Sequence, residues 1–442
     1  MKKIFPLVLT VLIFACENKN SKGTSESQKT ISRYAYYEQV FNQIDSLLKL
    51  DNSQFWGHEL YGPILFVNPD TREVIANQNN STGSFTKIGN VFKGTLPSEV
   101  NIANTATNWE GERWTMVMTP LPEDVNIRNN LIIHELFHRI QSSIGFDSLF
   151  EKNNNHLDTY TGRILLKLEL EALKNALDEE NSNSSNIHIE NALAFRRARQ
   201  SESDLQIAEN SLEINEGLAE YTGVMLSGRS EVEMKAHFKE SINLFYENKT
   251  FVRSFAYETI PIYGFMLSQV KPNWQKEIDK KTILTRYISD GLSIQSQEIK
   301  DYVAIATAND YSYSRILEEE KEREKQRLAQ LSAYRKTFIE NPTLSLQFRN
   351  MNISFDPRDI TPLEDYGTVY LIMRVTDDWG ILSVQKGALL SPTWSGVTVS
   401  EPTNFETQRV EGEGWTLELN EGWIVEKSAN SYLLKKAIAN KH

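Results

Sequence analysis

The sequence predicts an α+β protein in which an N-terminal mixed sheet and a mainly helical region are followed by a small all-β domain, either a sandwich or a barrel. Three observations lead to this prediction. Short apolar runs separated by turn residues occupy residues 62–119, helical periodicity dominates residues 126–289, and short strands return after Asn341-Pro342. With 442 residues, 40% of them apolar, the chain is long enough for two or three domains with their own cores.

The first residues have the pattern of a targeting segment. Lys2 and Lys3 make a basic start, and residues 4–14 form an apolar run that is short for a membrane span. Residues Ile13-Phe14-Ala15-Cys16 resemble the lipobox of bacterial lipoproteins. The resemblance implies cleavage before Cys16, a lipid anchor on it, and a place in the bacterial cell envelope, periplasmic or surface-facing. An ordinary secretory signal is the alternative, although Cys16 is the only cysteine and has no disulfide partner within the chain.

Changes in composition along the chain indicate how it is divided into parts. Polar residues after the signal indicate a flexible tether, and a charged stretch before Asn341 indicates a helical connector, with a coiled-coil partner site as the alternative. The expected parts are a signal peptide (1–15), the tether (16–33), a sheet-and-helix domain (34–310), the connector (311–341) and the all-β domain (342–442).

The individual elements are predicted from periodicity and turn residues. The hairpin turn Glu110-Gly111 separates two of the N-terminal strands, and Pro261 is expected to interrupt a helix. Strands are predicted at 62–67, 73–76, 87–95, 102–109, 113–119, 344–348, 369–375, 381–384, 397–399, 415–419 and 423–426. Helices are predicted at 34–50, 126–143, 158–180, 187–199, 204–226, 231–246, 252–269, 273–289 and 315–336, with a polar loop at 181–186.

The charge pattern narrows the range of partners. The net charge is −12, and the basic residues are dispersed along the chain. Nucleic-acid binding needs a clustered basic surface, so no nucleic-acid partner is expected. The sequence does not indicate an oligomeric state.

Residues His134-Glu135-Leu136-Phe137-His138 form an H-E-x-x-H pattern inside a predicted helix. Residues four apart lie one above the other on a helix, so both imidazoles can reach one metal ion. Glu135 can then contact a metal-bound water without being a ligand. Apolar residues on the other side of the helix predict its packing face: Ile132, Ile133, Leu136, Phe137 and Ile140.

A catalytic zinc site of this kind needs a third protein ligand and an open fourth position. The extended H-E-x-x-H-x-x-G-x-x-H pattern is not met, because Gln141 and Ile144 stand where glycine and histidine are required. A carboxylate from a later helix is the better candidate.

Residues 215–223 read NEGLAEYTG, and Glu-Gly-x-Ala-Glu downstream of H-E-x-x-H resembles the glutamate-ligand zinc peptidases, the gluzincins. The resemblance implies that Glu216 is the third ligand and that Glu220 accepts a hydrogen bond from a ligand histidine. Glu213 is the alternative ligand. Gly217 and Ala219 are small, which would let two helices approach closely around the ion.

Residues Ser254-Phe255-Ala256-Tyr257-Glu258 resemble the tyrosine-glutamate element of gluzincin aminopeptidases. The resemblance implies that Tyr257 stabilises the oxyanion of the reaction, with Tyr263 and Tyr221 as alternative residues. Alternatively, Tyr257 has no catalytic role and is an aromatic side chain packed in an apolar segment.

These residues predict zinc-dependent hydrolysis of peptide bonds, with one Zn²⁺ per chain, Glu135 as general base, and a peptide or protein substrate. Aminopeptidase and endopeptidase activity are not separated. The alternative is a non-catalytic envelope lipoprotein that binds peptide or glycan through its β domain and has an idle zinc site. Four tryptophans of that domain could stack on glycans or fill its core: Trp379, Trp394, Trp415 and Trp423.

Overall fold

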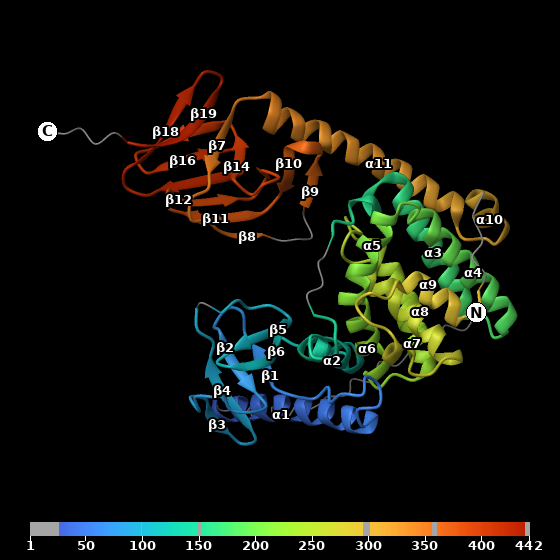
Figure 1. The fold of residues 1–442 in the computed structure, drawn as a ribbon. Helices are drawn as coiled ribbons and strands as arrows, with labels where there is room; N and C mark the ends of the chain where they lie inside the picture. The colour runs from blue at the N-terminus through green and yellow to red at the C-terminus, as the bar shows by residue number, and fades with distance from the viewer. Residues whose placement is uncertain (1–25, 99, 148–151, 295–300, 356–359, 438–442) are drawn as a thin grey trace, which may run out of the picture. The chain divides into compact units, whose positions relative to one another are not determined.

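A computed structural model describes residues 26–98, 100–147, 152–294, 301–355 and 360–437 (Figure 1). The chain divides into two compact units, one made of Met1–Leu50 and Tyr61–Leu121, the other of Asp51–Leu60 and Pro122–His442. The predicted α+β class is confirmed, with a mixed N-terminal sheet, a helical region and C-terminal sheets. The lipobox residues 13–16 and the signal peptide lie outside the described residues. Among those described, no helix is both long and apolar enough to cross a membrane.

The first unit is a twisted sheet with one long helix. The strands follow the order β3-β4-β2-β1-β6-β5, in which β1 and β6 run parallel and the other neighbours antiparallel. The elements are α1 (Glu26–Asp51), β1 (Ile64–Val67), β2 (Glu73–Ala76), β3 (Thr86–Ile88), β4 (Val91–Thr95), β5 (Thr105–Trp109) and β6 (Glu112–Met118).

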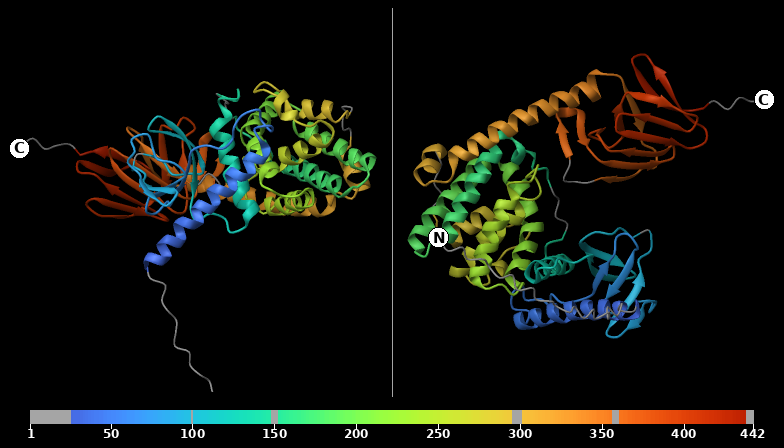
Figure 2. Two further views of the ribbon diagram at one scale, coloured as in Figure 1. Left: turned by 90° about the horizontal axis from the view of Figure 1, so that it is seen from below. Right: turned by 180° about the vertical axis from the view of Figure 1, so that it is seen from behind.

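Strand β1 is buried along its whole length because both faces of the sheet are covered near it. Helix α1 covers one face of the sheet (Figure 2, right). There the ring of Phe41 stacks on that of Phe66, with centroids 4.6 Å apart. On the other face, Leu65 and Val67 join a core that contains Trp114. This explains why the strand reads as an unbroken apolar run.

The second unit begins with a bundle of helices, in which α3 and α4 lie side by side. The elements are α2 (Val125–Gln141), η1 (Asn155–Asp158), α3 (Tyr160–Asp178), α4 (Ser182–Arg199), α5 (Ser203–Leu212), η2 (Glu213–Gly217), α6 (Leu218–Leu226), α7 (Glu231–Phe245), α8 (Ala256–Val270), η3 (Trp274–Glu277), α9 (Leu284–Gly291), α10 (Tyr302–Ala308), α11 (Tyr313–Arg335) and η4 (Lys336–Glu340).

Several predicted boundaries are wrong. Helix α1 already begins at Glu26, so residues 26–33 are helical where a tether was expected. The polar stretch 181–186 is mostly the first turn of α4, since the Asn181 side chain caps that helix by accepting from the Asn183 amide. Helix α8 runs through Pro261, because its apolar residues on both sides of the proline are buried and hold it in place.

The C-terminal region is a sandwich of two sheets that share one core. The first sheet has the order β18-β19-β7-β14-β13-β10-β9 and the second the order β15-β16-β17-β12-β11-β8. The strands are β7 (Thr343–Gln347), β8 (Asn352–Phe355), β9 (Ile360–Leu363), β10 (Gly367–Tyr370), β11 (Met373–Asp377), β12 (Gly380–Val384), β13 (Ala388–Leu390), β14 (Gly396–Ser400), β15 (Pro402–Phe405), β16 (Arg409–Gly412), β17 (Trp415–Leu419), β18 (Trp423–Ser428) and β19 (Ser431–Lys436), with the short helix η5 (Glu364–Tyr366).

The tryptophans of this sandwich are mainly structural. Trp379, Trp415 and Trp423 belong to its core, and only Trp394 is exposed, at 44%. The strand predicted over 369–375 is divided between the two sheets as β10 and β11, because the chain crosses from one sheet to the other at that point.

Candidate metal centre

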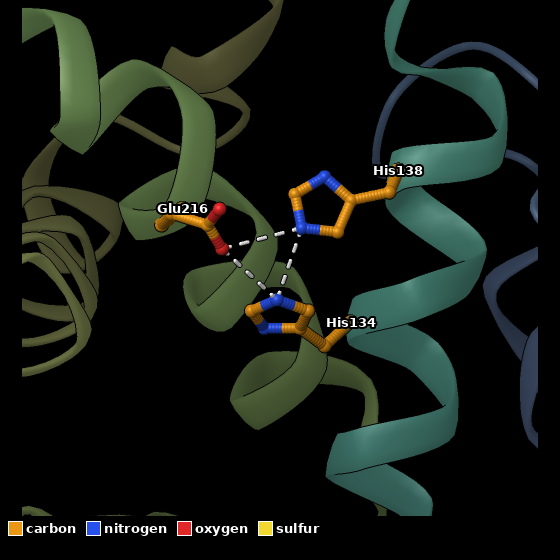
Figure 3. A group of neighbouring side chains, drawn as sticks. All are labelled: His134, His138 and Glu216. Atoms are coloured by element: carbon orange, nitrogen blue, oxygen red, sulfur yellow. Dashed lines mark hydrogen bonds and ion pairs between the residues drawn. The ribbon is translucent and has the colours of Figure 1, made fainter. Parts of the chain in front are cut away.

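Helix α2 fixes the two histidines. Asp124 caps its N-terminus by accepting from the Ile127 amide at 2.8 Å. The predicted apolar face is buried, and Phe137 packs against Trp56, with ring centroids 5.0 Å apart. His134 and His138 lie on the side of α2 that faces η2 and α6 (Figure 3).

Glu216 lies in a single π turn, η2, inserted between α5 and α6. The Leu218 amide donates to the Glu213 carbonyl, which is the five-residue spacing of a π turn. A π turn rotates by a smaller angle per residue than an α-helix does. The side chains of Glu213 and Glu216, three residues apart, therefore differ more in direction than they would in an α-helix. Inserted turns of this kind are frequent at functional sites.

Three side-chain atoms converge on one point. The Nε2 atoms of His134 and His138 are 3.1 Å apart, and Glu216 Oε2 is 3.5 Å from the first and 3.4 Å from the second (Figure 3). Tetrahedral bonds of 2.0–2.1 Å place neighbouring ligand atoms about 3.3 Å apart. This His134, His138 and Glu216 group could therefore hold a metal ion.

The charges around the group favour a cation. Burial opposes protonation of His134, but the Glu216 and Glu220 carboxylates outweigh it and raise the pKa of His134 to about 10. Burial likewise acts to raise the pKa of Glu216, yet the two histidines hold it well below its ordinary value. Facing lone pairs at these distances need a proton or a metal ion between them, and two imidazoles with a carboxylate are donors that bind divalent metal ions.

Both histidines are oriented through their other ring nitrogen. His134 Nδ1 lies 2.9 Å from Glu220 Oε2, the contact that the resemblance implied, and Asn130 donates to the other Glu220 oxygen at 2.7 Å. His138 Nδ1 lies 2.9 Å from Gln141 Oε1. Asn130 and Gln141 were not predicted, and only the spacing of Gln141, three residues after His138, could have indicated it.

Glu135 is buried beside the group. Glu135 is 5% exposed, and its Oε2 has no hydrogen-bond partner among the described residues. Burial raises the pKa of this carboxyl above its ordinary value. A buried carboxylate without a partner is costly unless it has a role that a bound water or ion would satisfy.

Tyr257 is the predicted tyrosine that reaches the group. Its hydroxyl donates to Glu216 Oε2 at 2.6 Å, and its ring stacks on that of His134, with centroids 5.5 Å apart. Burial and the Glu216 carboxylate raise the pKa of Tyr257 far above its ordinary value, so it is a neutral donor. The alternatives lie elsewhere, because Tyr263 donates to Glu169 and Tyr221 accepts from Trp274.

Glu213, the alternative ligand, is held away from the metal group. It is fully buried, paired with Arg196, and accepts from Thr259 at 2.7 Å. Arg196 also contacts Glu169 at 3.2 Å. Burial acts against the charge on Arg196, but Glu213 and Glu169 raise its pKa overall. Glu213 is thus part of a buried ion-pair network that anchors the start of the π turn.

Small residues allow the close approaches around the group, although one differs from expectation. A Cβ on Gly217 would lie 2.8 Å from Ile260 Cβ, so this glycine admits α8, which carries Tyr257. The close contact with α2 is made by Gly223, where a Cβ would lie 2.7 Å from the Asn130 carbonyl. The expected role of Gly217 against the motif helix is therefore taken by Gly223, six residues later on the side that faces α2.

Comparison with models of known protein families, with curated proteins and with solved structures gives no match for this chain. The arguments for function therefore rest on the geometry of the group itself.

Proposed function

We propose that this protein is a zinc-dependent peptidase with one metal ion per chain, held by His134, His138 and Glu216. The observation that carries the proposal is the convergence of two Nε2 atoms and one carboxylate oxygen at 3.1–3.5 Å. Buried Glu135 lies beside them, and its Oε2 has no hydrogen-bond partner in the part of the chain that the structure describes. This supports a catalytic rather than a structural site, since a purely structural site has no need of a base.

Each residue of the site has a separate role in the proposed hydrolysis. When bound, zinc supplies Lewis-acid polarisation of a water and of the scissile carbonyl. Glu135 takes the proton of the attacking water and passes it to the leaving amine, for which a carboxyl with a raised pKa is suited. Tyr257 donates to the oxygen that becomes negative, after exchanging its present acceptor on Glu216. Glu220 holds His134 in the tautomer that leaves Nε2 free.

Replacement of Tyr257 by phenylalanine tests the oxyanion role. We expect Tyr257→Phe to lower kcat about 100- to 1000-fold, because one donor to the developing charge is lost. KM and bound zinc should change little, as measured by steady-state kinetics on zinc-loaded protein. Loss of zinc with normal kcat after reloading would instead mean that the hydroxyl only orients Glu216.

The proposed activity is tested by metal content and a peptide-library digest. We expect one zinc per chain by elemental analysis, cleavage of peptides by the full-length protein, loss of cleavage with a chelator, and recovery on adding zinc. Positions of cleavage relative to the peptide ends separate aminopeptidase from endopeptidase activity. A protein that binds zinc but cleaves no peptide in the library would contradict the peptidase proposal.

The alternative of a glycan-binding β domain has less support. Glycan platforms present aromatic faces to solvent, whereas three of the four tryptophans of the domain lie in its core. Trp394 alone has the exposure that stacking requires.

A further inference from the structure

Gln141 connects the two elements that carry the metal-facing atoms. It is the last residue of α2, it is 7% exposed, and its Oε1 lies 2.9 Å from His138 Nδ1. Its Nε2 lies 3.2 Å from the Asn215 carbonyl, 3.1 Å from Asn215 Oδ1 and 3.5 Å from the Ile214 carbonyl. One amide group therefore contacts a ligand histidine on one side and the π turn of Glu216 on the other.

The donors and acceptors in these contacts determine which end of the Gln141 amide is the oxygen and which is the NH₂ group. The oxygens of Ile214 and Asn215 can only accept, so they require the NH₂ group of Gln141. The amide oxygen is then left for His138, and because it too can only accept, His138 Nδ1 carries the hydrogen. His138 Nε2 keeps its lone pair for a metal. The opposite amide orientation would set Oε1 against carbonyl oxygens and is excluded.

Each histidine is oriented by a side-chain oxygen at its Nδ1, but the two oxygens come from different groups, a carboxylate and an amide. His134 is oriented by Glu220 of α6, and His138 by Gln141, which in turn donates to η2. Each histidine is thus linked to the continuous stretch of helix that carries Glu216. The contact of His138 uses a neutral amide, which adds no further negative charge to a group that already contains Glu216 and Glu220.

We propose that Gln141 is a positioning residue of the metal centre, which sets the tautomer of His138 and holds the π turn of Glu216 against α2. This inference rests on the metal site of the proposed function. Gln141 affects two of the three ligands at once, so its loss is expected to weaken zinc binding by about 10- to 100-fold, the usual effect of removing a group that orients a ligand.

Zinc affinity of the full-length protein, measured by competition with a fluorescent chelator, tests the proposal. Gln141→Leu removes both contacts and should show the full loss. Gln141→Glu keeps an acceptor for His138 but sets a carboxylate against the Ile214 and Asn215 oxygens, so affinity should fall as well. Gln141→Asn, which is too short to span both contacts, serves if Gln141→Leu does not fold.

A matched control and a spectrum separate positioning from packing. Gln206 of α5 is half-buried and has no side-chain hydrogen bond among the described residues, so Gln206→Leu should leave zinc affinity unchanged. With cobalt(II) in place of zinc, Gln141→Leu should alter the visible absorption of the bound metal, which a loss of packing alone would not do.

The outcomes are distinguishable from those of the proposed function. Unchanged zinc affinity in Gln141→Leu, or an equal loss in Gln206→Leu, overturns the role of Gln141 while leaving the peptidase proposal intact. A wild-type protein that binds zinc but cleaves no peptide overturns the peptidase, and Gln141 is still judged by zinc affinity. A wild-type protein that binds no zinc overturns both.

Discussion

Glu135→Gln is expected to lower kcat/KM about 100- to 10,000-fold while zinc stays bound. The amide has nearly the shape of the carboxylate but cannot accept the proton of the attacking water. Glu135 is not one of the three converging ligand residues, so the metal group is left in place. Peptide cleavage and zinc per chain, measured on the same preparation, check both halves of this prediction.

The control for Glu135→Gln is Glu123→Gln, the same substitution at an exposed position just before α2. It should have full activity and full zinc. Substantial peptide cleavage by zinc-loaded Glu135→Gln would show that another group is the base and would remove the main argument that the site is catalytic.

Glu216→Ala is expected to release zinc, with a larger loss of affinity than the roughly 10- to 100-fold that follows removal of an orienting group. One of three ligand atoms disappears, and no other described carboxylate belongs to the converging group. The fold should remain, because the side-chain partners of Glu216 are the two histidines and Tyr257 of the group, the neighbouring Asn215, and the exposed Arg253. Equilibrium dialysis against zinc buffers and thermal unfolding of the apo protein measure the two effects.

Glu213→Ala is the matched comparison, three residues away, with the opposite expected result. Its loss leaves Arg196 buried without one of its carboxylates, which should lower the free energy of unfolding by about 3–5 kcal/mol. Zinc affinity of the folded protein should change little. If Glu213→Ala does not fold, Glu213→Gln, which keeps the shape, allows the zinc measurement. Zinc loss in Glu213→Ala but not in Glu216→Ala would transfer the ligand role to Glu213.

The sequence predicted well what depends on local geometry. Strand β2 lies at the predicted residues, and the strands β5 and β6 pair through the predicted turn at Glu110-Gly111. The apolar face of α2 is buried as its periodicity indicates. Such features need only neighbouring residues, because the alternation of a strand and the turn of a helix are set by the backbone itself.

Predictions failed where contacts distant in the sequence decide. Pro261 is tolerated inside α8 because the helix is buried among others. The polar stretch 181–186 is a separate case, since the cap that starts α4 there is a local contact between Asn181 and Asn183. Neither the packing around Pro261 nor the division of residues 369–375 between two sheets leaves a signal in a short window of sequence.

In the metal centre, too, some features follow from the local sequence and others depend on the tertiary structure. The spacing of His134 and His138 on one helix determined by itself that their imidazoles could share an ion, since residues four apart on a helix always lie on one side. Which carboxylate completes the group was decided by the tertiary structure. Glu213 and Glu216 would lie on neighbouring positions of one side of a regular α-helix, but the π turn sets their directions further apart. The buried Arg196 then pairs with Glu213 and leaves Glu216 for the histidines. The pairing of Glu220 with His134, which the resemblance implied, and the unpredicted pairing of Gln141 with the π turn both depend on how α2 packs against α6 and η2.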